Sequence, residues 1–218
     1  METGFLRVLF DPGRFFENRM RGEPSLKVPA LIALVIGVIG AVSVALAANI
    51  FVGILPAEAQ AIGVLMVGVA AVVAVIGGFL MWIIYGVIFY VISMAFKGEG
   101  SLARTLEVTG YGLLPQIFSG IIGAILSYQI IANLTLPVAR TPEEITAVTE
   151  NLAQIMATDP LAQIAGVVTI LFLVWSANIW IFGMKHARNL STRNAALTVG
   201  IPVGLYIIYL IIMLAGWL

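Results

Sequence analysis

Cysteine is absent from this sequence, and histidine occurs once, as His186. A chain without thiols forms no disulfide, no thiolate metal site and no thiol nucleophile. Charged residues are scarce as well, at 10% of the chain, whereas soluble domains carry about 25%. So few charges do not cover a water-facing surface, and a formal net charge of zero gives no reason to expect a nucleic-acid partner.

The motifs of common catalytic and metal sites are missing too. The sequence has no HExxH pattern, no Walker loop and no pair of aspartates inside an apolar run. His186 lies in a basic stretch, where a solvated or lipid-facing role is the ordinary one. We therefore expect no catalytic residue, no cofactor, no metal ion and no enzymatic activity.

Apolar residues, in contrast, make up 61% of the chain. Five runs reach the roughly 20 residues that a membrane-spanning helix requires. They are continuous and lack the period of two that marks the strands of a transmembrane barrel. The sequence therefore predicts an all-α integral membrane protein, a bundle of five transmembrane helices at about residues 28–55, 62–96, 106–131, 161–184 and 195–218.

The second run is longer than one span requires, so it is either a single long helix or a hairpin that turns at Gly77-Gly78. A single helix puts ten of the eleven Lys and Arg residues on the side of the N-terminus and Arg140 alone on the other. A hairpin would divide them almost evenly. Because basic residues gather on the cytoplasmic side, we expect one helix, a cytoplasmic N-terminus and an extracytoplasmic C-terminus.

Residues 1–27 precede the five-span domain at 28–218 and carry signals of a short interfacial helix. Asp11 followed by Pro12 is a typical helix start. Aromatic and basic side chains follow it at helical spacing, which is typical of a helix that lies on an anionic leaflet. Packing under the bundle is the alternative.

We expect the cytoplasmic face to contact membrane lipids and a protein partner. This face combines the N-terminal segment with the two basic loops that follow the second and fourth runs. The residues predicted to make these contacts are Arg14, Phe15, Phe16, Arg19, Arg21, Lys97, Arg104, Lys185 and Arg188.

Two further features lie on the predicted outer side. Thr141 with Glu144 forms a capping box, and apolar residues then recur at helical spacing, which predicts an amphipathic helix at about 142–157. Asn133 begins an Asn-Leu-Thr pattern for glycosylation. Whether Asn133 is modified stays open.

The predicted spans contain small residues at every fourth position and few polar ones. Small residues let helices approach closely in a membrane, either within this chain or in a homo-oligomer: Gly37, Ala41 and Ala45; Ala70, Ala74 and Gly78; Ala196, Gly200 and Gly204. The intramembrane polar residues are Asn49, Gln116 and Asn178, and we expect Asn49 and Asn178 to bond between helices. No ionisable residue is central in a run, which disfavours proton-coupled transport.

Several stretches resemble the Yip family, the Ypt/Rab-interacting membrane proteins, in its compact prokaryotic branch. Residues 96–102 read FKGEGSL and residues 110–115 read GYGLLP, which is similar to the family's glycine-rich cytoplasmic turn and third span. Residues 11–16, DPGRFF, resemble the opening of that branch. The stretch KHAR at 185–188 resembles the connection between its last two spans.

This resemblance implies five spans, a cytoplasmic N-terminus and a family motif in the third span made of Gly110, Tyr111, Gly112 and Pro115, which is either a structural hinge or a notch that binds a partner. Pro115 withdraws a backbone donor and should kink that span. Eukaryotic relatives act in vesicle traffic, bind prenylated Rab GTPases and organise membranes. This sequence lacks their DLYGP-type segment, so binding of a GTPase stays open.

The leading functional hypothesis is a non-enzymatic multi-pass scaffold or adaptor that organises membrane or recruits partners at its cytoplasmic face. The alternative is a small-solute or ion permease, alone or as a subunit of a larger transporter, which would need a polar path near Asn49, Gln116 and Asn178. A third hypothesis is membrane shaping by insertion of residues 1–27. The resemblance favours a prokaryotic plasma membrane.

Overall fold

The structure, a computed structural model, describes residues 3–134 and 136–215, without the side chains of residues 3–5, 49 and 142. Within these ranges the chain is helical and has no strand. Its elements are α1 Thr3–Phe10, α2 Pro12–Arg19, α3 Lys27–Gly53, the 3-10 helix η1 Ala57–Ala59, α4 Gln60–Ala95, α5 Leu102–Gly112, α6 Leu114–Ala132, α7 Pro142–Thr158, α8 Pro160–Ala187 and α9 Thr192–Leu214.

Five stretches are long and apolar enough to cross a membrane: α3, η1 with α4, α5 with α6, α8, and α9. This confirms the predicted all-α fold with five spans. α4 is unbroken through Gly77 and Gly78, so the long second run is one helix and not a hairpin. The predicted end of the last span, residues 216–218, lies outside the described part of the chain.

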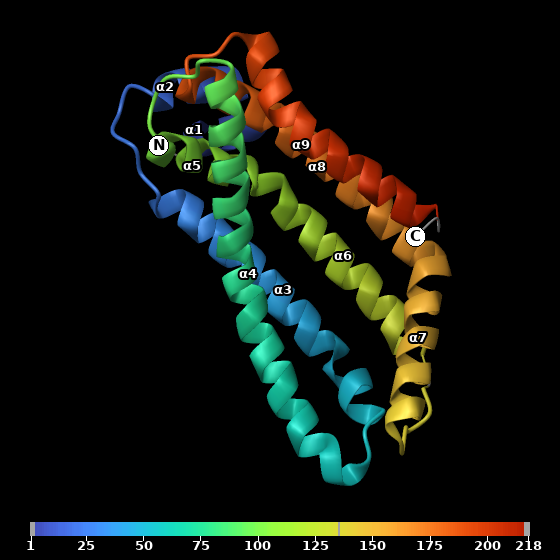
Figure 1. The fold of residues 1–218 in the computed structure, drawn as a ribbon. Coiled ribbons are helices and arrows are strands. Elements are labelled where there is room, and N and C mark those ends of the chain that lie inside the picture. The colour runs from blue at the N-terminus through green and yellow to red at the C-terminus, as the bar shows by residue number, and fades with distance from the viewer. Residues whose placement is uncertain (1–2, 135, 216–218) are drawn as a thin grey trace.

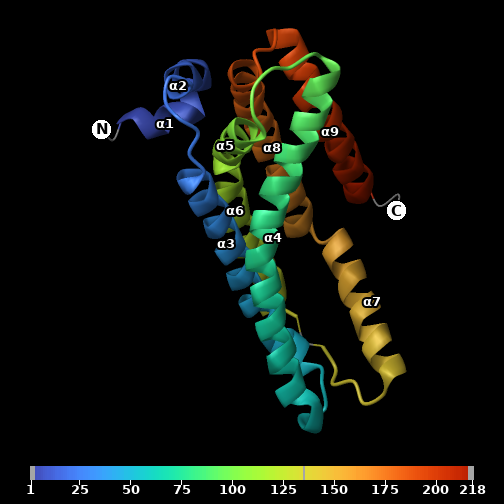
Figure 2. The same ribbon diagram turned by 60° about the vertical axis from the view of Figure 1, so that its left-hand side comes forward.

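The long helices form two antiparallel pairs, α3 with α4 and α8 with α9, and α6 lies between the pairs (Figure 1). The pairs converge where α1, α2 and α5 lie, called here the N-terminal end, and diverge toward the end where α7 lies (Figures 1 and 2). Buried apolar side chains gather at the N-terminal end, among them Phe16, Phe89, Val108, Trp180 and Met184. The remaining lengths of the helices expose apolar side chains, as helices facing lipid do.

Glycines explain the close pairing of α3 and α4. A β-carbon added at Gly78 would lie 2.5 Å from the backbone oxygen of Ala33, and one added at Gly37 would lie 2.7 Å from the backbone of Val75. This repeat of small residues therefore packs within the chain. On α9, in contrast, a β-carbon added at Gly200 or Gly204 would meet no heavy atom of another described part of the chain within 4 Å.

The third span is broken, as its proline predicted. Pro115 has no N–H to donate to the carbonyl of Tyr111 four residues earlier. α5 accordingly ends at Gly112 and α6 begins at Leu114, and Figure 1 shows α5 turned away from the direction of α6.

The predicted helix starts are also confirmed. Asp11 caps α2 by accepting a hydrogen bond from the N–H of Arg14 at 3.3 Å. Thr141 caps α7 by accepting one from the N–H of Glu144 at 3.2 Å, and α7 is the predicted amphipathic helix. Near it Asn133 is exposed and donates to the carbonyl of Gln129 at 2.8 Å. The third residue of its glycosylation pattern, at position 135, lies outside the described residues.

Candidate functional site: the N-terminal end of the bundle

An acidic side chain is fully buried at the N-terminal end. Glu107 of α5 has an exposed fraction of 0%. Its Oε2 accepts a hydrogen bond from Arg104 at 2.6 Å, and its Oε1 pairs with Arg19 and accepts the backbone N–H of Ser25 at 3.2 Å. A buried carboxylate is costly unless it is paired and hydrogen-bonded. The two guanidinium groups and the amide supply these partners.

This ion cluster of Arg19, Arg104 and Glu107 also holds the link between α2 and α3. Arg104 donates to the carbonyl of Gly22, and Arg19 donates to the carbonyl of Glu23 at 3.0 Å. The backbone of the link is thus bonded by Arg104 of α5 and by Arg19 of α2, and both arginines pair with Glu107 of α5. As a result, α2 and the start of α3 are fixed against the third span.

A second buried charged side chain bonds to the loop between α4 and α5. Arg188, only 2% exposed, donates to the Ser93 hydroxyl at 2.9 Å and to the carbonyls of Gly98, at 2.6 Å, and Gly100. Its guanidinium also lies 4.3 Å from the centre of the Tyr90 ring, an arrangement that favours a cation. Arg188 thus clamps the segment Lys97–Gly100, called here the glycine turn, against the end of α8.

The motif glycines of α5 admit two indole rings. A β-carbon at Gly110 would crowd Pro29 and the Trp82 ring, and one at Gly112 would overlap the Trp180 ring. The Trp82 indole N–H donates to the carbonyl of Leu106 at 2.7 Å, and the Trp180 indole N–H donates to the carbonyl of Thr109 at 2.8 Å. The glycines therefore let the tryptophans of α4 and α8 bond the backbone of α5 near the break in the third span.

Aromatic side chains of α2 complete the packing. The Tyr111 ring of α5 meets the Phe15 ring edge-on at 5.1 Å and the Phe16 ring at 6.3 Å. Phe16 also reaches Gly183 of α8, where a β-carbon would lie 3.2 Å from the Phe16 ring. Tyr111 of the predicted motif is thus part of the contact between α2 and the bundle.

The structure divides the nine predicted contact residues into three groups. For Phe16 and Arg188 the prediction is wrong: both side chains are buried and engaged inside the bundle. Arg19 and Arg104 are partly buried and pair with Glu107. The other five lie at the surface and are exposed or half-buried: Arg14, Phe15, Arg21, Lys97 and Lys185.

Sequence reasoning missed Glu107 as the centre of the cluster. Glu107 is the second residue of the third apolar run, 106–131, and no role was predicted for it. A signal was available, because Arg104 lies three residues earlier, at the spacing that pairs side chains on a helix. The role of Arg19 had no comparable signal, since it lies 88 positions from Glu107 in the sequence.

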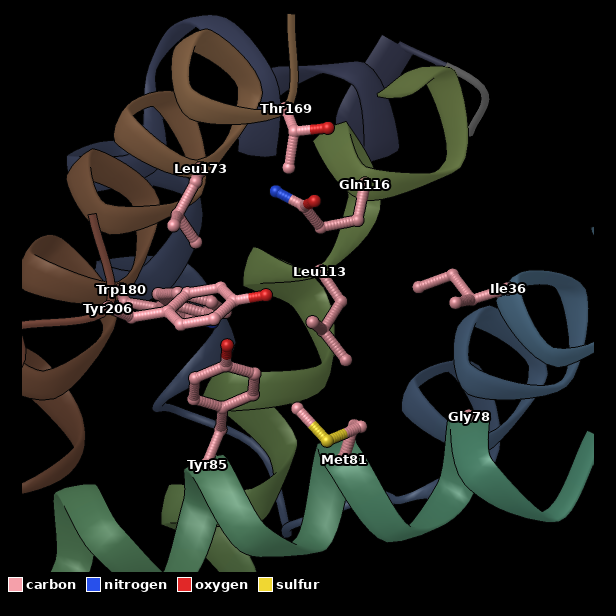
Figure 3. A pocket seen from close by; sticks show the side chains of 10 residues that line it. All are labelled: Ile36, Gly78, Met81, Tyr85, Leu113, Gln116, Thr169, Leu173, Trp180 and Tyr206. Carbon is pink, nitrogen blue, oxygen red and sulfur yellow. The ribbon is translucent and has the colours of Figure 1, made fainter. Parts of the chain in front are cut away.

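A cavity of about 180 Å³ lies deeper in the bundle, and Gln116 reaches into it (Figure 3). The Gln116 amide donates to the Ser176 hydroxyl of α8 at 3.0 Å, an interhelical bond that was not predicted for Gln116. Asn178 is exposed, about 200° around α8 from Ser176. Gln116 and Asn178 are therefore not brought together, and the Asn49 side chain lies outside the described residues.

These features define the class of protein: an integral membrane protein of five helical spans, with a buried polar cluster at one end of the bundle. The model of the Yip1 domain family matches residues 6–214, and the chain belongs to that family. It is 36% identical over 123 residues to an uncharacterised protein of Methanocaldococcus jannaschii, a match that covers 56% of this chain and 87% of the relative. No solved structure matches the chain.

Proposed function

We propose that this Yip1-domain protein is a non-enzymatic membrane scaffold or adaptor whose N-terminal end faces the cytoplasm and engages anionic lipid and a protein partner. The observation that carries the proposal is a basic and apolar surface on α1 and α2, backed by the ion cluster. The Yip1 family is not known as enzymatic, which agrees with this role.

The surface combines two kinds of exposed side chain. Leu6 and Phe10 of α1 are 59% and 77% exposed. Arg14 of α2 and Arg21, which follows α2, have side chains 79% and 74% exposed. Their acidic neighbours lie 3.6 and 3.9 Å away, at a separation and exposure that make such pairs weak. Exposed aromatic and basic groups on short helices are typical of segments that bind a lipid interface.

The buried groups beneath this surface supply its rigidity. The ion cluster ties α2 to α5, and Trp175 of α8 donates its indole N–H to the carbonyl of Leu9 at 3.0 Å. A surface that is already ordered loses less conformational freedom when a partner binds. This supports recruitment by a preformed face, with the basic groups contributing about 1 kcal/mol each on an anionic leaflet.

The proposed orientation can be tested directly because the chain has no cysteine. Glu23→Cys places a thiol at the N-terminal end, and Glu150→Cys places one on α7; both positions are exposed. In intact cells a membrane-impermeant maleimide should label Glu150→Cys and should label Glu23→Cys only after permeabilisation. The reverse pattern would overturn the cytoplasmic assignment.

Charge reversal tests the lipid and partner contacts. Arg14→Glu with Arg21→Glu changes the proposed surface, and Arg140→Glu is the matched control at the opposite end. In nanodiscs that contain phosphatidylserine, hydrogen exchange of α1 and α2 should be slower than in phosphatidylcholine alone. The double variant should lose this protection, and the control should keep it.

Crosslinking in native membranes tests the partner. A partner that crosslinks to α2 or the glycine turn in the unchanged protein should be lost with the double variant and retained with Arg140→Glu. Equal recovery from all three proteins, together with lipid-independent exchange, would remove the scaffold proposal. Solute flux into liposomes by the purified protein would instead support the permease alternative.

A further inference from the structure

The cavity deep in the bundle holds polar groups without partners. It lies among α3, α4, α6, α8 and α9, next to the break between α5 and α6. The hydroxyl groups of Tyr85 and Tyr206 turn into the same space, and the Gln116 amide approaches from another side (Figure 3). Neither hydroxyl makes a hydrogen bond to another described residue. In an apolar bundle, such groups are stabilised only if something else in the cavity bonds them.

The remaining bonding capacity defines what fits. Each tyrosine hydroxyl can donate one hydrogen bond, and the Gln116 oxygen can accept one while its nitrogen donates to Ser176. None of the described residues that line the cavity is charged. An ionic group would therefore lack a counter-charge at a depth where its burial is costly. The cavity suits an uncharged group with two acceptor oxygens and one donor.

The cavity lies within the membrane-spanning lengths of the helices. Tyr85 lies one turn along α4 from Trp82, and the Trp82 ring lies beside Gly110 at the level of Pro29, the third residue of α3. Lys27 begins α3 and should lie at the membrane boundary, where long basic side chains reach the interface. Tyr85 therefore lies toward the boundary, whereas Tyr206 is the fifteenth residue of α9, about 21 Å from the start of that helix. The cavity thus reaches well into the span, where a lipid without a charged headgroup enters at lower cost.

The cavity opens sideways toward lipid. Met81 of α4 and Tyr206 of α9 line it and are 46% and 40% exposed. Its volume of about 180 Å³ equals that of roughly six water molecules in the liquid. This is enough for a small polar linkage and far too little for a whole lipid. Acyl chains attached to the linkage would leave between α4 and α9.

From these observations we propose that the cavity binds the glycerol backbone of a neutral diacylglycerol-type lipid. Its two ester carbonyls accept hydrogen bonds from Tyr85 and Tyr206, and its free hydroxyl donates to Gln116. Both acyl chains remain in the leaflet. This inference does not depend on the scaffold proposal, because it concerns a different part of the molecule and no protein partner.

The test uses the full-length protein in phosphatidylcholine nanodiscs with an alkyne-tagged diacylglycerol that carries a diazirine next to one ester. After irradiation, mass spectrometry should find the tag on the segments around Met81 and Tyr206. Tyr85→Phe and Tyr206→Phe should each raise the half-saturating probe concentration roughly fivefold, the amount expected for one neutral hydrogen bond. Tyr209→Phe is the matched control, since Tyr209 stacks on Tyr206 but does not line the cavity.

Two results would overturn the proposal. One is labelling without the expected selectivity. Either the diacylglycerol probe and a phosphatidylcholine probe with the same chains label the cavity equally, or the labelling does not change in Tyr85→Phe and Tyr206→Phe. The other is the absence of label from the cavity segments while the rest of the protein is labelled. Thermal unfolding of each variant establishes that it is folded, and removal of one exposed or half-buried hydroxyl should leave the unfolding temperature unchanged.

Discussion

Replacing Glu107 with glutamine removes the negative charge of the ion cluster and leaves the size of the side chain almost unchanged. Arg19 and Arg104 would then face an amide in place of a carboxylate. Removing one partner of a buried ion pair costs about 3–5 kcal/mol. The side chains of the two arginines are 23% and 13% exposed and can regain some water. We therefore expect a loss of about 3 kcal/mol, near the lower bound.

Thermal unfolding in detergent, followed by tryptophan fluorescence, measures this loss. For a chain of this size 1 kcal/mol corresponds to about 2–4 °C, so the midpoint should fall by about 6–12 °C. The loss should be local at first, because the cluster holds the link between α2 and α3. Limited proteolysis at moderate temperature should therefore cut near Arg21 in Glu107→Gln before it cuts elsewhere.

Glu17→Gln is the matched control, because Glu17 is an exposed acid at the same end and pairs with Arg21 at 3.9 Å. Exposed pairs contribute about 0–1 kcal/mol, so this variant should unfold near the midpoint of the unchanged protein. A double variant, Arg104→Gln with Glu107→Gln, should cost less than the sum of the two single changes. If Glu107→Gln were as stable and as resistant to protease as Glu17→Gln, the account of the cluster would be refuted.

Three further predictions concern other parts of the chain. Arg188→Lys should lower the free energy of unfolding by about 2 kcal/mol, since one ammonium cannot replace the bonds of the guanidinium. Hydrogen exchange in the glycine turn should become faster, and unchanged exchange would contradict the role of Arg188 in holding that turn. Gly112→Ala should lower the free energy of unfolding by about 1–3 kcal/mol, because the added β-carbon overlaps the Trp180 ring. In Gly77→Ala the added β-carbon meets no atom within 4 Å, so calorimetry should find this variant equally stable or more stable. The pKa of Glu143 is lowered, first by a hydrogen bond from its own backbone N–H and then by one from the Thr141 hydroxyl. The charged carboxylate should therefore stabilise the start of α7 at pH values above the ordinary pKa, and this stabilisation should be lost as the pH falls through the lowered pKa. An NMR titration of Glu143 with a midpoint at or above the ordinary value would contradict this.

The sequence was sufficient for the spans because their signal is local. Apolar length defines five helices, and the distribution of basic residues decided between one helix and a hairpin in the second run, a choice that the unbroken α4 confirms. The break in the third span follows from one proline. The close approach of α3 and α4 follows from glycines at Gly37 and Gly78, although the sequence did not say which partner they would meet.

Burial at the N-terminal end could not be predicted in the same way. Phe16 and Arg188 looked like surface residues because aromatic and basic side chains near a span often contact lipid headgroups. Their burial depends on the glycine turn and on Gly183, which come from distant parts of the chain. Glu107 is a buried charge for the same reason, since Arg19 approaches it only when α2 packs on α5.

The position of these partners along the chain sets an order of assembly. Proteins are made from the N-terminus at about 5–20 residues per second. Every partner of Glu107 in the ion cluster lies before it in the sequence, so all residues of the cluster have been made once the start of the third span has been made. Trp180 and Arg188 follow only after roughly 4–16 seconds more of synthesis at that rate. In the interval the carbonyls of Thr109 and Gly100 lack these donors. The packing of α8 on the N-terminal end is therefore the last contact of this region for which the residues become available.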